Sequence, residues 1–94
     1  MRPLMPADLD MAVRVLLAVP EARRPALARR LIAEAREADD HRRRTGWMHP
    51  RHGGGTLLQA AELHPKSPLP EHCDRAYRDM LEHLIAACTD LLVD

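Results

Sequence analysis

Apolar residues recur at helical spacing along most of the chain, and this pattern predicts an all-α protein. The first helix is expected to begin at Pro6, because proline suits a first helical turn, and to end near Val19. Its apolar residues form two stripes rather than one, with Arg14 as the main interruption. A helix that is apolar nearly all round is buried nearly all round, so this segment needs other helices on several sides.

A second helix is predicted from Pro25 to Arg44, after a proline-bounded corner that allows one helical turn at most. Gly46 follows it as a stop signal. Oppositely charged side chains four residues apart are expected on its solvent side: Arg30/Glu34, Arg36/Asp40, Asp39/Arg43 and Asp40/Arg44. Residues 6–45 are therefore predicted to form an antiparallel helical hairpin with a narrow, alanine-rich seam.

Residues 46–70 are predicted to supply a glycine-rich loop, a short helix and a proline-rich connector. Thr56 and Gln59 have the spacing of a capping box, in which each side chain satisfies a backbone amide at the start of the short helix. The segment 70–92 has the widest apolar stripe of the chain and is predicted to be a long C-terminal amphipathic helix.

The length of 94 residues allows one domain, 1–94, of the small size at which a single core is only marginally stable. Such a chain is expected to be too short to surround its first helix, so a second copy is predicted to cover it and the protein to form a homo-oligomer. The alternative is that this helix is the centre of an intramolecular bundle. The predicted oligomer interface consists of Leu9, Met11, Val13, Val15, Leu16, Leu27 and Leu31.

The last helix is expected either to cover the hairpin or to be presented to a partner protein. In the second case its apolar stripe makes the contact, through Tyr77, Met80, Leu84 and Leu91.

Charge divides the chain, although the fourteen basic and fourteen acidic residues cancel overall. Residues 20–53 hold nine arginines against five acids, whereas residues 54–94 hold three bases against seven acids. The basic half contains a run of three arginines with a fourth in the glycine loop, and these are the candidate nucleic-acid contacts: Arg42, Arg43, Arg44 and Arg51. Contact with an acidic protein surface and a solvated helix end are the alternatives. Any DNA binding is expected to be weak, non-specific and directed at the backbone.

No catalytic site, metal site or cofactor is expected from the sequence. His49 and His52 fall in a loop taken to be flexible, and His72 and Cys73 are neighbours that point to different sides of a helix. The glycine loop lacks the lysine and the preceding strand of a phosphate-binding loop. With neither an export signal nor a stretch apolar enough to span a membrane, the protein is expected to be cytoplasmic and to have no membrane partner.

One family resemblance covers most of residues 1–60. The run His41-Arg42-Arg43-Arg44-Thr45-Gly46, the following His49-Pro50-Arg51 and glycines leading into Thr56-Leu57, the opening Arg2-Pro3-Leu4 and the corner Leu17-Ala18-Val19-Pro20 carry it. On these residues the chain resembles short alphaproteobacterial proteins of gene transfer agent clusters with a small-terminase role in DNA packaging.

The resemblance implies a non-enzymatic, ring-forming adaptor that binds DNA and recruits the large terminase subunit. Small terminases generally carry a DNA-binding helix-turn-helix in front of the helical hairpin, and here the hairpin begins by Pro6. Sequence-specific recognition of a packaging site is therefore not expected. The alternative function is a small, dimeric, helical regulatory module that binds a protein partner and no DNA.

Overall fold

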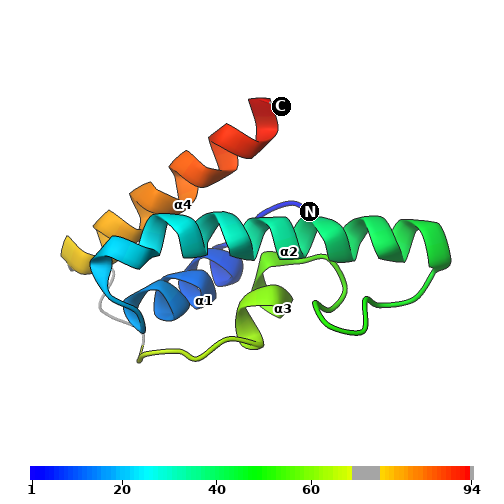
Figure 1. Ribbon diagram of the computed structural model, residues 1–94, viewed down its shortest axis with the longest axis horizontal. Coiled ribbons are helices and arrows are strands. Elements are labelled where there is room, and N and C mark those ends of the chain that lie inside the picture. Colours follow the sequence, from blue (N-terminus) through cyan, green and yellow to red (C-terminus); the bar gives the residue numbers. More distant parts are fainter. Residues whose placement is uncertain (69–74, 94) are drawn as a thin grey trace.

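The computed structural model describes residues 1–68 and 75–93, and in the last helix it describes the side chains of residue 75 and of residues 77–87. All regular elements in this part of the chain are helical, which confirms the predicted all-α class (Figure 1). In chain order they are α1 (Pro6–Leu17), the short 3₁₀ helix η1 (Glu21–Arg23), α2 (Arg24–Thr45), α3 (Leu57–Glu62) and α4 (Arg75–Val93).

The ends of the helices follow local signals in the sequence. Asp8 accepts a hydrogen bond from the Met5 backbone N–H at 2.7 Å and so caps the start of α1. Gly46, at φ 79°, ends α2 in the left-handed conformation that glycine adopts without a Cβ clash. Thr56 accepts the Gln59 N–H at 3.1 Å and caps α3, as predicted. The amide oxygen of Gln59, in contrast, accepts the Gly54 N–H at 2.8 Å.

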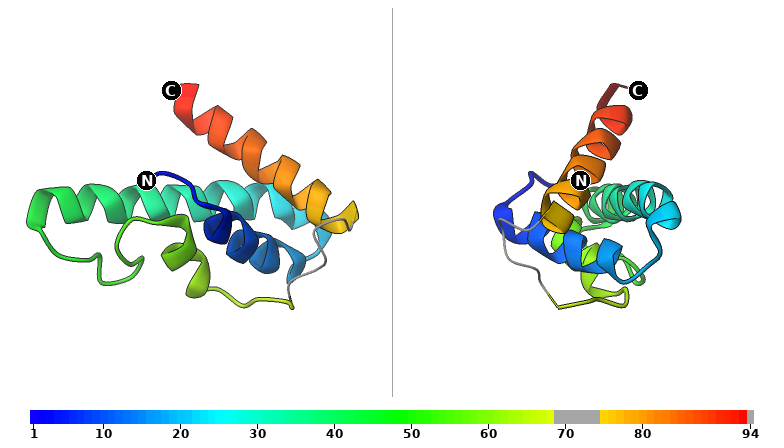
Figure 2. Two further views of the ribbon diagram at one scale, coloured as in Figure 1. Left: turned by 180° about the vertical axis from the view of Figure 1, so that it is seen from behind. Right: turned by 90° about the vertical axis from the view of Figure 1, so that its left-hand side faces the viewer.

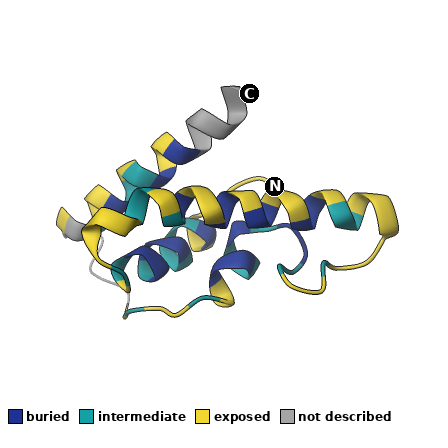
Figure 3. Cartoon of the chain, viewed as in Figure 1, coloured by how far each residue is buried: buried dark blue, intermediate teal, exposed yellow. Residues whose placement is uncertain are grey.

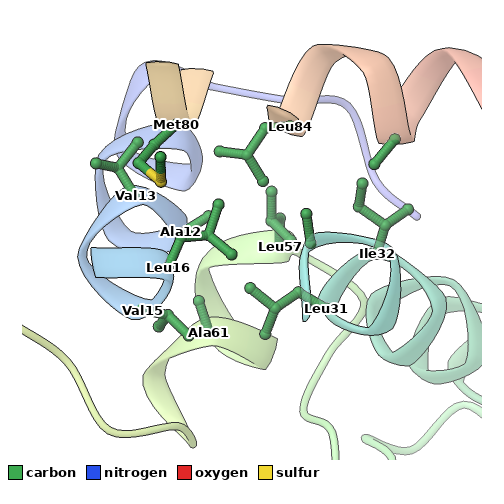
Figure 4. Packing of buried hydrophobic residues seen from close by; sticks show 12 residues of the cluster. Ala12, Val13, Val15, Leu16, Leu31, Ile32, Leu57, Ala61, Met80 and Leu84 are labelled. Atoms are coloured by element: carbon green, nitrogen blue, oxygen red, sulfur yellow. The ribbon is translucent and has the colours of Figure 1, made fainter. Parts of the chain in front are cut away.

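The core lies where α1, α3 and α4 meet the first half of α2 (Figure 4). Helix α1 packs more extensively on α3 and α4 than on α2. Asp8 ties two helix starts together, because its second oxygen accepts the Leu58 N–H at 2.8 Å. The buried cluster consists of Ala12, Val13, Val15, Leu16, Ala28, Leu31, Ile32, Leu57, Ala61, Met80, Leu84 and Ala87.

The predicted oligomer interface is largely part of this core. Its fully enclosed members are Val13, Val15, Leu16 and Leu31, each at most 1% exposed within the single chain. The other three, Leu9, Met11 and Leu27, are partly buried against the same cluster. For the four enclosed side chains, the prediction that a second copy covers them is wrong, because the helices of the same chain cover them. For Leu9, Met11 and Leu27 it stays a prediction. Oligomerisation itself stays a prediction.

The predicted partner-binding stripe of the last helix is also turned inward. Met80 and Leu84 are buried in the core, so assigning them to a partner contact is wrong. Tyr77 packs against the core and its hydroxyl donates to Asp10 Oδ1 at 2.9 Å. Burial, the hydrogen bond to Asp10 and the negative charge of Asp10 together raise the pKa of Tyr77. The side chain of Leu91 lies outside the described residues.

The two halves of α2 differ in their surroundings. Its first half is covered by the other helices, whereas its second half extends beyond α1 and α3 and is accompanied by the loop that follows it (Figure 2). The last turn of α2, residues 43–45, is exposed (Figure 3). None of the helices in the described residues is long and apolar enough to cross a membrane.

Candidate functional site

The candidate nucleic-acid contacts lie on the last turn of α2 and on the loop that follows it. Arg43 and Arg44 are exposed on its last turn, Arg51 is exposed on the loop beyond it, and Arg42 is half-buried. Two large apolar side chains on the loop directly after α2 are also exposed: Trp47 is 77% exposed and Met48 is 57% exposed. We call this group of six residues, Arg42, Arg43, Arg44, Trp47, Met48 and Arg51, the basic tip.

A buried carboxylate lies beneath the basic tip. Asp39 is 1% exposed, and its Oδ2 atom lies 3.2 Å from Arg43 Nη2 and 3.3 Å from the Met1 ammonium group. Among the described residues, neither Asp39 Oδ1 nor Arg42 Nε has a hydrogen-bond partner. The sequence placed the Asp39/Arg43 pair on the solvent side. The structure corrects this for Asp39, which is buried. The guanidinium group of Arg43 therefore pairs with a buried carboxylate of the same chain.

The turn after α2 is held by side-chain to backbone hydrogen bonds. Thr45 Oγ1 donates to the His41 carbonyl at 2.8 Å and accepts the Trp47 N–H at 3.1 Å. Further along, His49 Nδ1 accepts the backbone N–H groups of Arg51 and His52 at 3.0 and 3.2 Å. These hydrogen bonds order the turn, in which Arg51 is exposed and the His52 side chain faces Glu34 of α2.

Glycine lets the loop return closely along α2. Gly55 has φ 104°, and a Cβ atom built on it would lie 2.7 Å from Asp39 Cβ and 2.8 Å from Asp39 Cα. Only a residue without a side chain fits at this distance. The Gly55 carbonyl in turn accepts the Arg2 N–H at 2.8 Å.

A second group of ionisable side chains lies where α2 faces this loop and the segment directly after α3. It comprises four imidazoles and two carboxylates, which we call the histidine cluster: Glu34, Glu37, His41, His49, His52 and His64. The rings of His49 and His52 stack with centroids 4.6 Å apart, and His41 meets His49 edge-on at 5.1 Å.

Distances within the histidine cluster fall into two classes. His64 Nε2 lies 2.9 Å from Glu34 Oε1, which is a direct hydrogen bond. The imidazoles of the loop are farther from the carboxylates, with His49 Nε2 3.5 Å from Glu37 Oε1 and His52 Nε2 3.7 Å from Glu37 Oε2. His52 Nδ1 is 3.6 Å from Glu34 Oε2. Ligand atoms of Glu37, His49 and His52 all lie within 4.8 Å of one another.

Sequence reasoning missed the histidine cluster because it treated the loop as flexible. It also placed Glu34 on the solvent side, whereas the structure buries it between Arg30, His52 and His64. The signal that was available is the spacing three and seven residues apart of Glu34, Glu37 and His41, which puts them on one face of α2.

Comparison with known families adds one result. A family model described as "Domain of unknown function (DUF7742)" matches residues 2–88. The chain belongs to this family. Neither a curated protein nor a solved structure matches the chain. The DUF7742 match includes both the basic tip and the histidine cluster, and the family's description assigns them no role.

Proposed function

We propose that this protein is a non-enzymatic, small-terminase-like adaptor for DNA packaging, which contacts the DNA backbone through the basic tip. The observation that carries the proposal is that Arg43, Arg44 and Arg51 are all exposed, on the last turn of α2 and on the loop that follows it. Guanidinium groups bind phosphates through paired hydrogen bonds, and a surface with several of them binds DNA of any sequence.

Trp47 strengthens the proposal because it follows Arg44 by three residues in the chain and is largely exposed. An indole ring can stack on an unpaired base or wedge between base steps, whereas the arginines hold the phosphates on either side. Such a surface binds the backbone and responds to DNA shape, but it carries little information about base sequence. This fits a packaging adaptor that accepts DNA with little discrimination.

Self-assembly belongs to the same proposal, and one groove with a partly apolar lining supports it. A groove of about 510 Å³ lies between the end of α1, η1 and the start of α2. Leu27, a partly buried member of the predicted oligomer interface, lines it together with three exposed alanines, Ala18, Ala22 and Ala26. We propose that the edge of a second copy packs here, and that the assembled ring recruits the large terminase subunit. Light scattering tests the assembly, which a strict monomer at micromolar concentration would contradict.

The DNA-binding proposal is tested with two arginine pairs on the full-length chain. The tip variant is Arg44→Ala with Arg51→Ala; Arg43 is kept because it lies against buried Asp39. The matched control is Arg29→Ala with Arg78→Ala, which removes the same charge from exposed positions outside the basic tip. Duplex binding is measured by fluorescence anisotropy of a labelled DNA over a series of salt concentrations.

The tip variant is expected to bind more weakly and to reduce the slope of log K against log salt by about 2, one for each lost phosphate contact. The control is expected to keep the slope of the unchanged protein. Equal slopes for the two variants would show that DNA responds to net charge alone, and the basic tip would then lose its assigned role.

A further inference from the structure

The loop between α2 and α3 is docked without apolar anchors. Within residues 46–52, Trp47 and Met48 are exposed, and the two partly buried side chains are His49 and His52. Both imidazoles face carboxylates on α2. Polar side chains therefore hold this segment on the helix, so the nature of the imidazole-carboxylate contact decides how firmly it is held.

The distances from the loop imidazoles to the Glu37 carboxylate are longer than those of hydrogen bonds. A nitrogen and an oxygen joined by a hydrogen bond lie about 2.7–3.2 Å apart, as His64 and Glu34 do at 2.9 Å. Two ligand atoms bound to one tetrahedral metal at about 2.0–2.1 Å lie about 3.4 Å apart. His49 Nε2 lies 3.5 Å from Glu37 Oε1, and His52 Nε2 lies 3.7 Å from Glu37 Oε2. Ligand atoms of all three residues lie within 4.8 Å of one another, so small side-chain movements would bring them to the second value.

We propose that Glu37, His49 and His52 bind a divalent transition metal, Zn²⁺ in the first instance. Two imidazoles and one carboxylate are a donor set that Zn²⁺ accepts, with water in the fourth position. The two imidazole side chains are 13% and 22% exposed, whereas the Glu37 side chain is 62% exposed, so a metal could reach the site from solvent on the Glu37 side.

The neighbouring side chains suit a cation at this position. Glu34 is 11% exposed and adds a second negative charge beside His52. His64 and Arg30 contact the same carboxylate and hold it in place. In metal sites such outer contacts orient the groups around the metal, and their loss weakens binding.

Metal binding would change the tautomer of the His49 ring. His49 Nδ1 accepts two backbone N–H groups, so in the neutral ring the proton is on Nε2. The metal displaces that proton to solvent, and Nδ1 takes up a proton in its place. The amides of Arg51 and His52 then lose their acceptor and turn to water. Binding is therefore expected to rearrange the turn that carries Arg51, and to crosslink the loop to α2.

The test is titration of chelator-treated full-length protein with Zn²⁺ by isothermal calorimetry. One Zn²⁺ per chain is expected, and His49→Gln, His52→Gln and Glu37→Gln should each weaken binding by more than about 10-fold. His83→Gln is the matched control, because it removes an imidazole from α4, and it should leave the affinity unchanged. Amide resonances of Arg51 and His52 should shift on binding. All three ligand candidates lie outside the core, so circular dichroism should show the variants folded.

Three results would overturn the site. One is that the unchanged protein binds Zn²⁺ no more tightly than the His52→Gln variant does. Another is a loss in His83→Gln equal to that in the ligand variants. The third is a thiolate charge-transfer band with Co²⁺, which would place the metal on cysteine. Because the readout is metal binding, these results do not depend on whether the protein binds DNA.

Discussion

The two ends of α2 are held in place by different kinds of contact. The first half buries Ala28, Leu31 and Ile32 against α1, α3 and α4, so apolar area removed from water stabilises it. The second half is held by polar contacts: it buries Asp39 under the basic tip and meets its own following loop through imidazoles, carboxylates and a glycine. One helix thus joins an apolar core to an end rich in charged and polar side chains.

This difference separates the side chains that stabilise the fold from those to which we assign the proposed binding. Truncating the core should lower the free energy of unfolding without altering the chemistry of the basic tip. Removing polar side chains at the tip should change binding and cost little stability, because most of them are exposed. The following predictions compare neighbouring or equivalent positions in the two regions.

The largest effect is expected for Leu84→Ala in α4. Leu84 is fully buried in the core, so its truncation should lower the free energy of unfolding by about 2–5 kcal/mol. The adjacent Ile85 is 56% exposed, and Ile85→Ala should cost less than about 1 kcal/mol. Urea denaturation followed by circular dichroism measures both. Similar losses for the two variants would mean that α4 does not pack on the core through this face.

A smaller effect is expected where the loop approaches α2. Gly55→Ala places a Cβ atom against Asp39 at a positive φ, and should cost roughly 2–4 kcal/mol. Gly46→Ala is the control, because Gly46 also has a positive φ but no atom within 4 Å of its added Cβ, so its cost should be about 1 kcal/mol. Thermal denaturation compares them, and equal costs would contradict the close approach of the loop.

The helices could be predicted from sequence because their signals are local. Pro6, Gly46 and Thr56 mark helix ends through backbone geometry and capping, and each acts where the pattern placed it. The packing could not be predicted in the same way. The six-residue helix α3 gives Leu57 and Ala61 to the core, and with α4 it covers the apolar faces of α1 that were assigned to a second copy.

The candidate site was partly predictable for the same reason. A run of arginines at a helix end is visible in sequence, and Arg43 and Arg44 are indeed exposed. The histidine cluster joins residues of α2 to residues of a loop that folds back on it, and that return depends on Gly55 fitting against Asp39. A contact of this kind arises from tertiary structure, so neither helical periodicity nor motif spacing reveals it.

Trp47 is the one tryptophan of the chain and lies in the basic tip, so its fluorescence tests the central claim directly. Titration with unlabelled duplex DNA at low salt should change the Trp47 emission to saturation, and added salt should reverse the change. DNA binding seen by anisotropy of a labelled duplex, with Trp47 emission unaltered throughout, would show that DNA contacts another surface and would contradict the account.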